Sequence, residues 1–365
     1  MSLDALRGRR VLVTGDTGFK GAWLCTWLLE LGAEVWGFAL PPPTEPSLFA
    51  EAELARRLRH VEGDVRDLAA VRAVIDAAQP EVVFHLAAQA LVRPSYVSPG
   101  ETFDVNVMGT VHVLEALRLW GRSCAVVAVT SDKAYEEHAG PAAYREGDPL
   151  GGSDPYSASK GAAEIVIASY RRSFFRRGVA LASVRAGNVI GGGDWAEDRI
   201  VPDIVRALLA GEPVRLRNPQ AVRPWQHVLD ALSGYLWLAA RLLGEGAEGL
   251  AEPWNFGPEP GTDLDVESLT ERILRAWGGG TWQATGEEGG PREAGYLALS
   301  IDKAKTHLHW RPTWDVLRAV DETVAWYKDR GTPAFERTSA QIRLYHEDAR
   351  GAGQVFAVGA ARARG

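Results

Sequence analysis

Residues 11–21 of the chain read Val-Leu-Val-Thr-Gly-Asp-Thr-Gly-Phe-Lys-Gly, a short apolar strand that runs into a turn with glycines at 15, 18 and 21. A helical pattern over 22–31 follows at once. Glycines have no side chain that would keep a ligand away from their backbone N–H groups. At a helix N-terminus these N–H groups can bind a diphosphate, so this arrangement predicts a dinucleotide-binding unit. A merely structural turn is the alternative. The glycine spacing is G-x-x-G-x-x-G rather than G-x-G-x-x-G, so its position between the first strand and the first helix carries the prediction.

Strand-length apolar runs alternate with helical patterns through the first half of the chain. Strands are predicted at 11–14, 34–39, 82–86, 125–130 and 179–185, and helices at 22–31, 68–78, 105–119 and 155–176. Such alternation is typical of βαβ units with a parallel sheet buried on both faces. We therefore predict an α/β fold with a doubly wound, Rossmann-like parallel sheet.

The second half has a different texture, which predicts a smaller mixed α/β lobe. It holds a Gly191–Gly193 run, a helix near 202–210, extended pieces at 214–217 and 254–256, and Gly/Glu-rich spacers at 244–252 and 278–290. A helical segment over 228–243 is expected to rejoin the first unit. The predicted division is a dinucleotide-binding domain of 1–187 plus about 222–257, a substrate-binding lobe of about 188–221 plus 258–335, and a C-terminal helix with a mobile tail in 336–365.

Composition narrows the functional classes. The 365 residues are 46% apolar and 24% charged with a net charge of -7, so a globular protein is expected and no positive field attracts nucleic acid or an anionic membrane. Neither a signal peptide nor a membrane-spanning run is expected. Cys25 and Cys124 lie in apolar runs, which predicts buried free thiols and a cytoplasmic location. No metal is expected, because His307 and His309 lack ligands spaced to complete a zinc site.

Tyr156 and Lys160 form the first candidate catalytic pair. They stand four residues apart at a helix start marked by Pro155, so both side chains lie on one face. An ammonium beside a phenol favours the phenolate, and so would a positive nicotinamide ring, which together predict a Tyr156 pKa below its usual value of about 10 and a base for alcohol oxidation. An exposed helical pair is the alternative, and the Gly-rich turn upstream favours the catalytic interpretation.

Further candidates follow other strands. Ser131, Asp132 and Lys133 come directly after the strand at 125–130, where ligands of open parallel sheets bind, although a solvated turn is the alternative for Asp132 and Lys133. Asp64 follows a further short strand and is a candidate for the adenine, whereas Asp67 suits a helix N-cap. The strand at 34–39 ends without the acid that usually accepts the ribose hydroxyls, so these residues leave NAD and NADP both open.

Several longer motifs share a family resemblance. TGDTGFKG, HLAAQALV, TSDKAYEE, YSASKGAAE, RAGNVIGGGDWAEDRIVPD, RPWQHVLD and WNFGP occur in unbroken order over about residues 8–345. Together they resemble the nucleotide-sugar branch of the extended short-chain dehydrogenase/reductase family, and within it the CDP-glucose 4,6-dehydratases. The Gly-rich turn and Tyr-x-x-x-Lys are common to the superfamily, whereas 131–133, 185–195 and 223–228 are more specific.

The resemblance implies NAD as cofactor, CDP-glucose as substrate and a lyase reaction: transient oxidation at C4, loss of water across C5 and C6, and hydride return to C6. It implies that Tyr156, supported by Lys160 and Ser131, removes the 4-hydroxyl proton, that Lys133 is the base at C5 and that Asp132 is the acid at the C6 hydroxyl. The related dTDP-glucose dehydratases read Thr-Asp-Glu at this strand end. Lys133 at the third position departs from that pattern and agrees with the CDP-glucose type.

The resemblance also implies the binding residues. Cofactor contacts are expected from Gly15, Thr17, Gly18, Phe19, Lys20, Gly21, Asp64, Val65, Leu86, Ala87, Ala88, Thr130, Tyr156 and Lys160. Substrate contacts are expected from Gln89, Asn188, Arg199, Arg223 and Arg292, since arginine forks suit a diphosphate. A surface salt bridge is the alternative for Arg223 and Arg292.

These residues alone do not fix the oligomeric state or the exact reaction. A homo-oligomer, a dimer or a pair of dimers, is implied, packed through the helices near 105–119 and 155–176. Three alternatives are left open: another nucleotide-sugar dehydratase acting on a dTDP- or GDP-sugar, a 4-epimerase, and a non-catalytic dinucleotide sensor.

Overall fold

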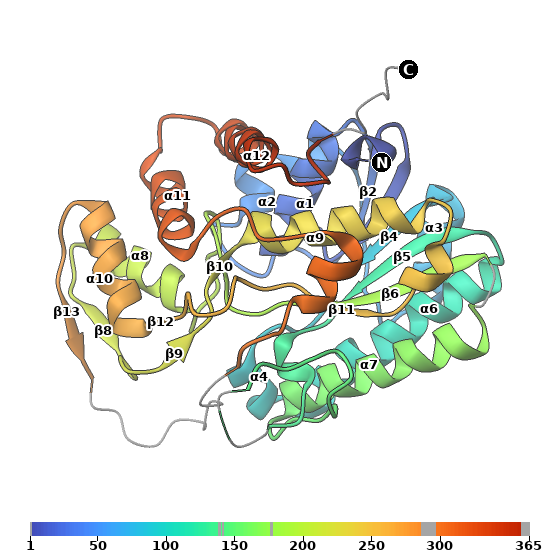
Figure 1. Cartoon of the computed structure of the whole chain (residues 1–365), viewed down its shortest axis with the longest axis horizontal. Helices are drawn as coiled ribbons and strands as arrows, with labels where there is room; N and C mark the ends of the chain where they lie inside the picture. The colour runs from blue at the N-terminus through green and yellow to red at the C-terminus, as the bar shows by residue number, and fades with distance from the viewer. Residues whose placement is uncertain (1, 138–139, 141, 176–177, 286–296, 359–365) are drawn as a thin grey trace.

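In the computed structural model of the chain, seven strands form one parallel sheet in the order β11-β6-β5-β4-β1-β2-β3 (Figure 1). The strands are β1 Arg10–Thr14, β2 Glu34–Ala39, β3 Arg59–Glu62, β4 Val82–His85, β5 Cys124–Val129, β6 Val179–Arg185 and β11 Pro253–Asn255. The structure describes residues 2–137, 140, 142–175, 178–285 and 297–358. The predicted doubly wound parallel fold is confirmed.

Two helical layers cover the sheet, and the alternation along β1 shows why its strands are apolar throughout. Val11 and Val13 pack into the core that includes α1 (Phe19–Glu30) and α9 (Val228–Leu242). Leu12 points the other way, into the core formed with α3 (Leu68–Ala78), α6 (Gly109–Trp120) and α7 (Pro155–Ser173). Figure 1 shows α9 on one side of the sheet and α6 and α7 on the other. A strand buried on both faces has no polar side to alternate.

The strand order places a ligand crevice at β1. The connection after β1 leads to β2 and β3 on one side of β1, and the chain then crosses to β4 on its other side. The connections at the carboxyl end of β1 therefore run in opposite directions. Such a switch point is where open α/β sheets bind ligands. The Gly15 turn and the segment after β4 meet there, with the Leu86 N–H donating to the Thr14 carbonyl at 3.0 Å.

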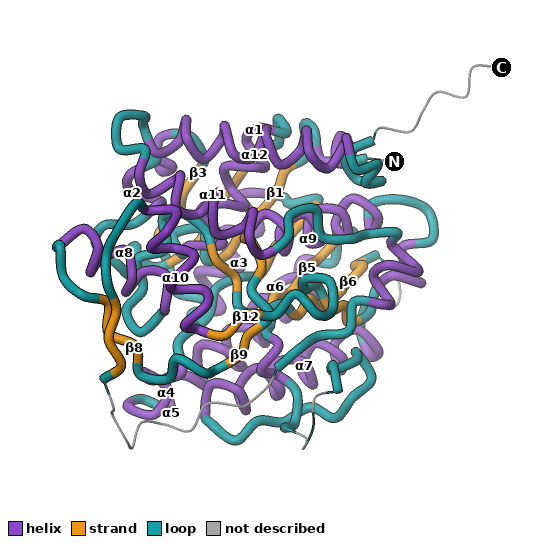
Figure 2. The backbone as a smooth tube through the Cα atoms, turned by 60° about the vertical axis from the view of Figure 1, so that its left-hand side comes forward, coloured by secondary structure: helices purple, strands orange, loops and turns teal. Residues whose placement is uncertain are grey.

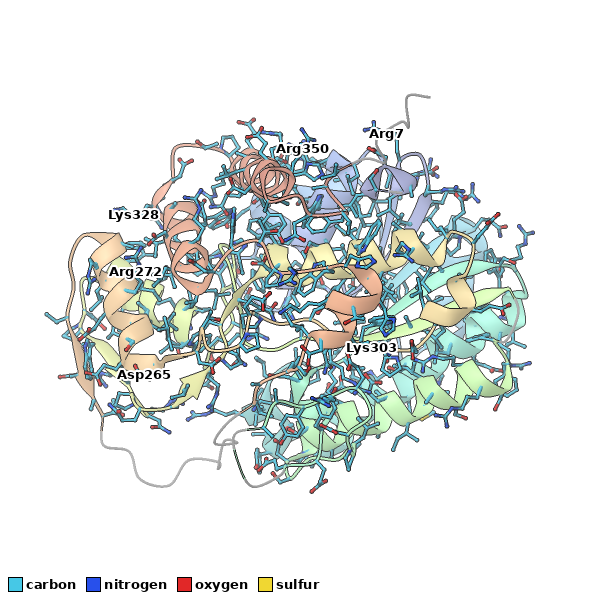
Figure 3. All side chains as sticks on the ribbon, in the orientation of Figure 1. Arg7, Asp265, Arg272, Lys303, Lys328 and Arg350 are labelled. Atoms are coloured by element: carbon cyan, nitrogen blue, oxygen red, sulfur yellow. The ribbon has the colours of Figure 1, made fainter. Side chains whose placement is uncertain are left out.

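A smaller lobe lies beside the sheet, at the left of Figure 1. It contains α8 Ile200–Ala210, β8 Val214–Leu216 paired with β13 Trp282–Ala284, β9 Val222–Arg223 paired with β12 Leu264–Asp265, α10 Val266–Trp277 and α11 Val316–Lys328. Polar contacts join its last two helices: Arg272 of α10 forms an ion pair with Asp321, and the Lys328 Nζ donates to the Trp277 carbonyl at 2.8 Å (Figure 3).

Shorter elements complete the chain. They are η1 Leu3–Leu6, α2 Leu48–Glu51, η2 Leu54–Arg56, α4 Val92–Val97, α5 Pro99–Phe103, η3 Asp104–Met108, η4 Asp132–Ala134, β7 Val189–Ile190, β10 Gln226–His227, η5 Ala247–Leu250 and η6 Ala304–Leu308. β7 and β10 pair in parallel at the boundary between the sheet and the smaller lobe. No helix within the described residues is both long and apolar enough to cross a membrane.

The C-terminal part differs from the prediction. α12 spans Ala334–Gly351 and lies along α1 (Figures 1 and 2). After it, Phe356 is fully buried and its carbonyl accepts from the Leu3 N–H at 3.2 Å, so residues 352–358 pack on the N-terminal turn instead of forming the start of a mobile tail. The Gly/Ala/Arg-rich composition hides this single aromatic anchor; residues 359–365 lie outside the described part.

Two further sequence predictions concern the core. Cys25 and Cys124 are both buried and free, as predicted. β11 lies next to β6 in the main sheet, after a stretch of chain that visits the smaller lobe, which agrees with the expectation that the segment after residue 228 rejoins the first unit. The division into domains itself stays a prediction.

A buried ion pair fixes α7 against the sheet. The Glu164 carboxylate accepts from the Arg185 Nε and Nη2, both at 2.9 Å, and from the hydroxyls of Thr130 and Ser183 at 2.5 and 2.8 Å. The Glu164 and Arg185 side chains are 3% and 2% exposed. Arg185 also donates to the Tyr135 hydroxyl at 2.7 Å. Each charge is therefore fully compensated by the other and by neighbouring dipoles.

We predict that Glu164→Gln lowers the free energy of unfolding by about 3–5 kcal/mol, because it leaves the Arg185 charge buried without a counterion. Urea unfolding followed by tryptophan fluorescence measures the loss. The control is Glu53→Gln, whose partner Arg56 lies three residues away; the two side chains are 54% and 78% exposed, so its loss should cost at most about 0.5 kcal/mol. Equal losses in the two variants would contradict the structural importance of the Glu164 pair.

Candidate active site

The Gly-rich turn after β1 is closed tightly enough to require its glycines. Gly15 has a φ of +79°, and a Cβ on Gly15 would lie 2.6 Å from the Ala87 nitrogen. A Cβ on Gly21 would lie 2.0 Å from the Gly15 carbonyl oxygen. α1 begins directly after Gly18, which provides no side-chain cap for the first amides of the helix. This cradle of bare amides fits the diphosphate of a dinucleotide.

The adenosine end of the predicted cofactor site is lined by the turns after β2 and β3. The Asp64 carboxylate is held by Arg66, whose Nε and Nη2 donate at 2.8 and 2.6 Å, and Val65 is buried against Gly109. Asp67 caps α3 through the amides of Ala69 and Ala70, as its alternative interpretation predicted.

Residues that follow β5 and β6 come together around the carboxylate of Asp132, the predicted catalytic acid. Ser131 and Asp132, both 5% exposed, follow β5, and the Ser131 hydroxyl donates to the Asp132 Oδ1 at 3.0 Å. The Asn188 Nδ2 donates to the Asp132 Oδ2 at 3.3 Å. A Cβ on Gly187 would lie 1.7 Å from that oxygen, so the carboxylate occupies the space that a side chain would fill. Lys133 is less buried than Asp132 and lies beside it in η4.

Tyr156 lies at the start of α7, next to this acid group. Its backbone N–H donates to the Ser95 hydroxyl at 3.2 Å, which joins α7 to α4. Burial raises the pKa of Tyr156 to about 12; a hydrogen bond from Ser131 and the charge of Arg199 oppose the rise, and the nearby Asp132 and Asp154 carboxylates add to it. The predicted lowering of this pKa is therefore wrong for the protein by itself, because burial and carboxylates outweigh the cations around the phenol.

Three cations crowd the space between the cofactor turn and Tyr156. Burial lowers the pKa of Lys160 to about 8, and the charge of Lys20 adds to the effect. Burial also lowers the pKa of Lys20 to about 8, assisted by Arg199 and opposed by Asp132 and Asp194. Lys20 therefore belongs to the catalytic neighbourhood as well as to the turn where the sequence placed it. Both lysines approach the pH range in which an amine exchanges protons.

The predicted substrate-binding residues have different surroundings in the structure. Arg199 is the N-cap residue of α8, and its Nη1 lies 3.0 Å from the Asp194 Oδ2. Arg223 is buried in β9 with an Nη1 bond to the Val222 carbonyl. The Gln89 amide is bonded to Leu91 of its own loop and to Thr102 of α5. Arg292 lies outside the described residues.

The histidine at the end of β4 is a packed residue. His85 is buried between the hydroxyls of Thr14 and Thr110, at 2.7 and 3.1 Å, and burial lowers its pKa to about 3. Across the described parts of the chain, no group of three or more His, Cys, Asp or Glu side chains could hold a metal ion.

Three residues that hold the proposed site residues in place were not predicted from the sequence. Asp194, which is 4% exposed and pairs with Arg199, stood in a quoted motif without a role. Gly187 belongs to the same motif, also without a role, and Ser95 was not singled out. The fourth residue of a short helix and a glycine after a strand carry no local signal, because their partners are 61 and 55 residues away in sequence.

Comparison with known proteins gives one family and consistent relatives. Residues 11–248 match the NAD dependent epimerase/dehydratase family. The chain is 49% identical to the CDP-glucose 4,6-dehydratase of Salmonella typhimurium over 88% of this chain and 91% of the relative. It is 31% identical to the dTDP-glucose 4,6-dehydratase of Streptomyces antibioticus over 87% and 92% of the two chains.

Solved structures agree with this fold. A dTDP-glucose 4,6-dehydratase from Streptomyces venezuelae, whose structure contains NAD, superposes with a TM-score of 0.73 and 26% identity over 88% of this chain and 98% of that one. The UDP-glucose 4-epimerase of Thermus thermophilus, in complex with NAD, gives a TM-score of 0.74 and 26% identity over 88% and 99%.

We predict that Gly21→Ala weakens NAD binding by at least about tenfold and lowers the thermal unfolding midpoint, because the new Cβ meets the Gly15 carbonyl oxygen at 2.0 Å. Isothermal titration and thermal unfolding measure the two effects. The control is Gly18→Ala, whose Cβ meets that oxygen only at 3.4 Å; it should keep the unfolding midpoint while its methyl group obstructs the diphosphate. Unchanged NAD affinity in both variants would rule out this turn as the cofactor cradle.

Proposed function

The chain belongs to the NAD dependent epimerase/dehydratase family, and from this we propose that it is a CDP-glucose 4,6-dehydratase, which converts CDP-D-glucose to CDP-4-keto-6-deoxy-D-glucose. The observation that carries the proposal is Ser131-Asp132-Lys133 at the end of β5, beside Tyr156 and Lys160, in a chain 49% identical to an enzyme of that name. A lysine at the third position separates this triplet from the Thr-Asp-Glu pattern of the dTDP-glucose type.

The cofactor is NAD, as in the family at large. The residues proposed to hold it are the Gly15–Gly21 turn for the diphosphate, Asp64 and Val65 for the adenine, and the segments 86–88 and Thr130 at the neighbouring strand ends. When bound, NAD supplies a hydride acceptor for C4 of the sugar and a hydride donor for C6.

The chain's own residues then handle the protons. Tyr156 takes the proton of the 4-hydroxyl, helped by Ser131 and Lys160, and the positive charges of Lys160, Arg199 and Lys20 stabilise its phenolate. The 4-ketone makes the C5 hydrogen acidic, so Lys133 takes it as a proton. Asp132 gives a proton to the departing C6 hydroxyl, which leaves as water. When the hydride returns to C6, Lys133 gives its proton back to C5, and the proton that Tyr156 took from the 4-hydroxyl balances the one that Asp132 gave. The substrate diphosphate is proposed to contact Asn188, Arg199, Arg223 and Arg292, with Gln89 near the sugar.

Neighbouring functions of the same family differ in products. A 4-epimerase inverts C4 and loses no water, and a dTDP- or GDP-sugar dehydratase performs the same elimination on another nucleotide. The buried Asp132 beside Lys133 favours elimination over epimerisation, because epimerisation needs neither an acid at C6 nor a base at C5.

We expect the purified protein with NAD to remove one water from CDP-glucose and not from dTDP-, GDP- or UDP-hexoses, as measured by mass spectrometry. Substrate deuterated at C4 should give a product deuterated in its methyl group, because the hydride returns to the same molecule. Loss of water from dTDP-glucose alone would overturn the assignment to CDP-glucose. Inversion at C4 with the mass unchanged would indicate an epimerase, and intact NAD binding without any turnover would indicate a sensor.

We predict that Lys133→Met lowers turnover by about 10²–10⁴-fold, the usual contribution of a general base, and abolishes exchange of the C5 hydrogen with deuterated solvent. The matched control is Lys328→Met, on the far helix α11, which should leave both measurements unchanged. Unimpaired solvent exchange at C5 in Lys133→Met would assign the base to another group.

We also propose a cytoplasmic homodimer or pair of dimers joined through η3, α6 and α7. These elements carry exposed apolar side chains, among them Met108 at 42%, Leu119 at 47%, Ile165 at 60% and Phe174, just beyond α7, at 53%. Burying such side chains in a four-helix contact favours association. A species of single-chain mass in sedimentation analysis at micromolar concentration would count against it.

A further inference from the structure

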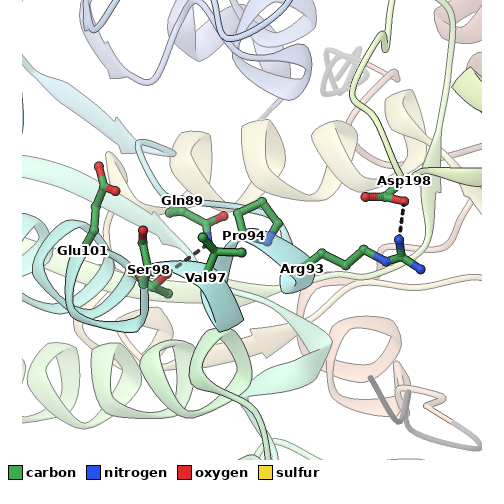
Figure 4. Close-up of a pocket in the computed structure, with 8 residues that line it drawn as sticks. Gln89, Arg93, Pro94, Val97, Ser98, Glu101 and Asp198 are labelled. Carbon is green, nitrogen blue, oxygen red and sulfur yellow. Dashed lines mark hydrogen bonds and ion pairs between the residues drawn. The ribbon is translucent and has the colours of Figure 1, made fainter. Parts of the chain in front are cut away.

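A cavity of about 350 Å³ opens between α4, α5 and the segment that leads into α8. It is lined by Gln89, Arg93, Pro94, Val97, Ser98, Glu101, Thr102 and Asp198 (Figure 4). One wall is α4, where the Ser95 hydroxyl accepts from the Tyr156 N–H. The other wall is the segment that leads into α8, where Asp198 precedes Arg199, a residue whose charge acts on Tyr156. Two residues next to lining residues, Ser95 and Arg199, therefore connect the cavity to Tyr156.

Two arginines from different parts of the fold meet at one carboxylate in this cavity. The Arg93 Nη1, from α4, lies 3.1 Å from the Asp198 Oδ1 (Figure 4). The Arg217 Nη1, one residue beyond β8 in the smaller lobe, lies 3.0 Å from the same oxygen. Two guanidinium groups that converge on a single oxygen mark a point of high positive potential, where an anion with several oxygens is held well.

The ion pairs of Asp198 with Arg93 and Arg217 are weak enough for another anion to replace Asp198. The side chains of Arg93, Asp198 and Arg217 are 42%, 40% and 35% exposed, so water screens both ion pairs and each contributes little stability. Asp198 offers one negative charge and has a left-handed backbone, with a φ of +60°, in a connecting segment. A diphosphate offers about two charges and more oxygens, and it can accept bidentate bonds from both forks at once.

From this geometry we infer that Arg93 and Arg217 clamp the diphosphate of a nucleoside diphosphate sugar, and that Asp198 holds the two arginines in place until the diphosphate replaces it. The inference rests on the proposed function for the class of substrate. It adds two binding residues, one from each side of the cleft, to those that the sequence motifs indicate. Asp198 then acts as an internal competitor that sets how tightly the diphosphate binds.

The clamp predicts opposite effects for its members. In the full-length protein with NAD, Arg93→Met and Arg217→Met should each weaken binding of CDP by about tenfold and leave binding of cytidine unchanged, because cytidine has no phosphate to hold. Asp198→Asn should strengthen CDP binding by about threefold or more, because it removes the competing charge. Asparagine tolerates a left-handed backbone, so this variant preserves the turn. Isothermal titration calorimetry gives all these affinities.

A matched control separates the clamp from general loss of surface charge. Arg318→Met removes an exposed arginine whose ion pair with Glu322 lies on α11, and it should change neither affinity. A structural latch between the two sides would make all three cleft variants weaken CDP binding, so weaker binding by Asp198→Asn would overturn the inference. Equal losses for CDP and cytidine in the arginine variants would overturn it as well.

The same titrations distinguish this inference from the proposed function. A clamp that reads only the diphosphate acts on UDP, GDP or dTDP as it does on CDP. If the unaltered protein binds one of those and not CDP, the assignment to CDP-glucose fails, and the variants are compared with that nucleotide and its nucleoside. If the unaltered protein binds CDP and the arginine variants bind it equally well, the clamp fails and the function stands.

Discussion

One buried carboxylate holds the catalytic parts in register. Glu164 lies on α7 one turn after Lys160, and it accepts bonds from Thr130 at the end of β5 and from Ser183 and Arg185 of β6. Because an unpaired charge at this depth is costly, sliding α7 along the sheet would break several bonds at once. Tyr156 and Lys160 on the helix are thereby fixed relative to Ser131 and Asp132 on the strand end. The proposed reaction needs these groups within hydrogen-bond reach of one sugar ring, so its geometry depends on a contact that takes no part in it.

Charge crowding gives the site its character. Lys20 comes from the cofactor turn, Lys160 from α7 and Arg199 from the start of α8. The charges of Asp132 and Asp194 oppose the lowering of the Lys20 pKa, and the charge of Glu164 opposes that of Lys160. Burial and like charge together lower the pKa values of both lysines to about 8. A neighbourhood of this kind attracts phosphates and favours anionic forms of a phenol or an alcohol. The cofactor turn thus contributes to the reaction centre electrostatically, in addition to its bare amides.

The sequence was sufficient for features that are local or periodic. The Gly15–Gly21 turn, the run of parallel strands and the strand-end position of Ser131 and Asp132 follow from glycine spacing and from apolar runs. It was insufficient where residues distant in sequence meet. The sequence around Gly187 does not indicate that the Asp132 carboxylate occupies the position of a Cβ there, and the sequence around Ser95 does not indicate its hydrogen bond with the Tyr156 N–H. In the protein by itself the pKa of Tyr156 moves opposite to the predicted direction, because burial, which sequence proximity to Lys160 does not reveal, dominates it. α10 and α11 were missed although each carries a local signal that could have found it, an Asp N-cap at 265 or 315 followed by apolar residues at helical spacing.

The place of β11 has a practical consequence for anyone who wishes to divide the protein. This strand closes one edge of the sheet against β6, yet it enters only after the chain has passed through α8 and β8. A truncation anywhere between residues 190 and 252 would strip β6 of its neighbour and expose an unpaired row of amides and carbonyls, a surface that recruits other strands and aggregates. The nucleotide-binding half is therefore not separable by shortening. Isolating it would require excising the intervening segment and rejoining the ends with a designed connection.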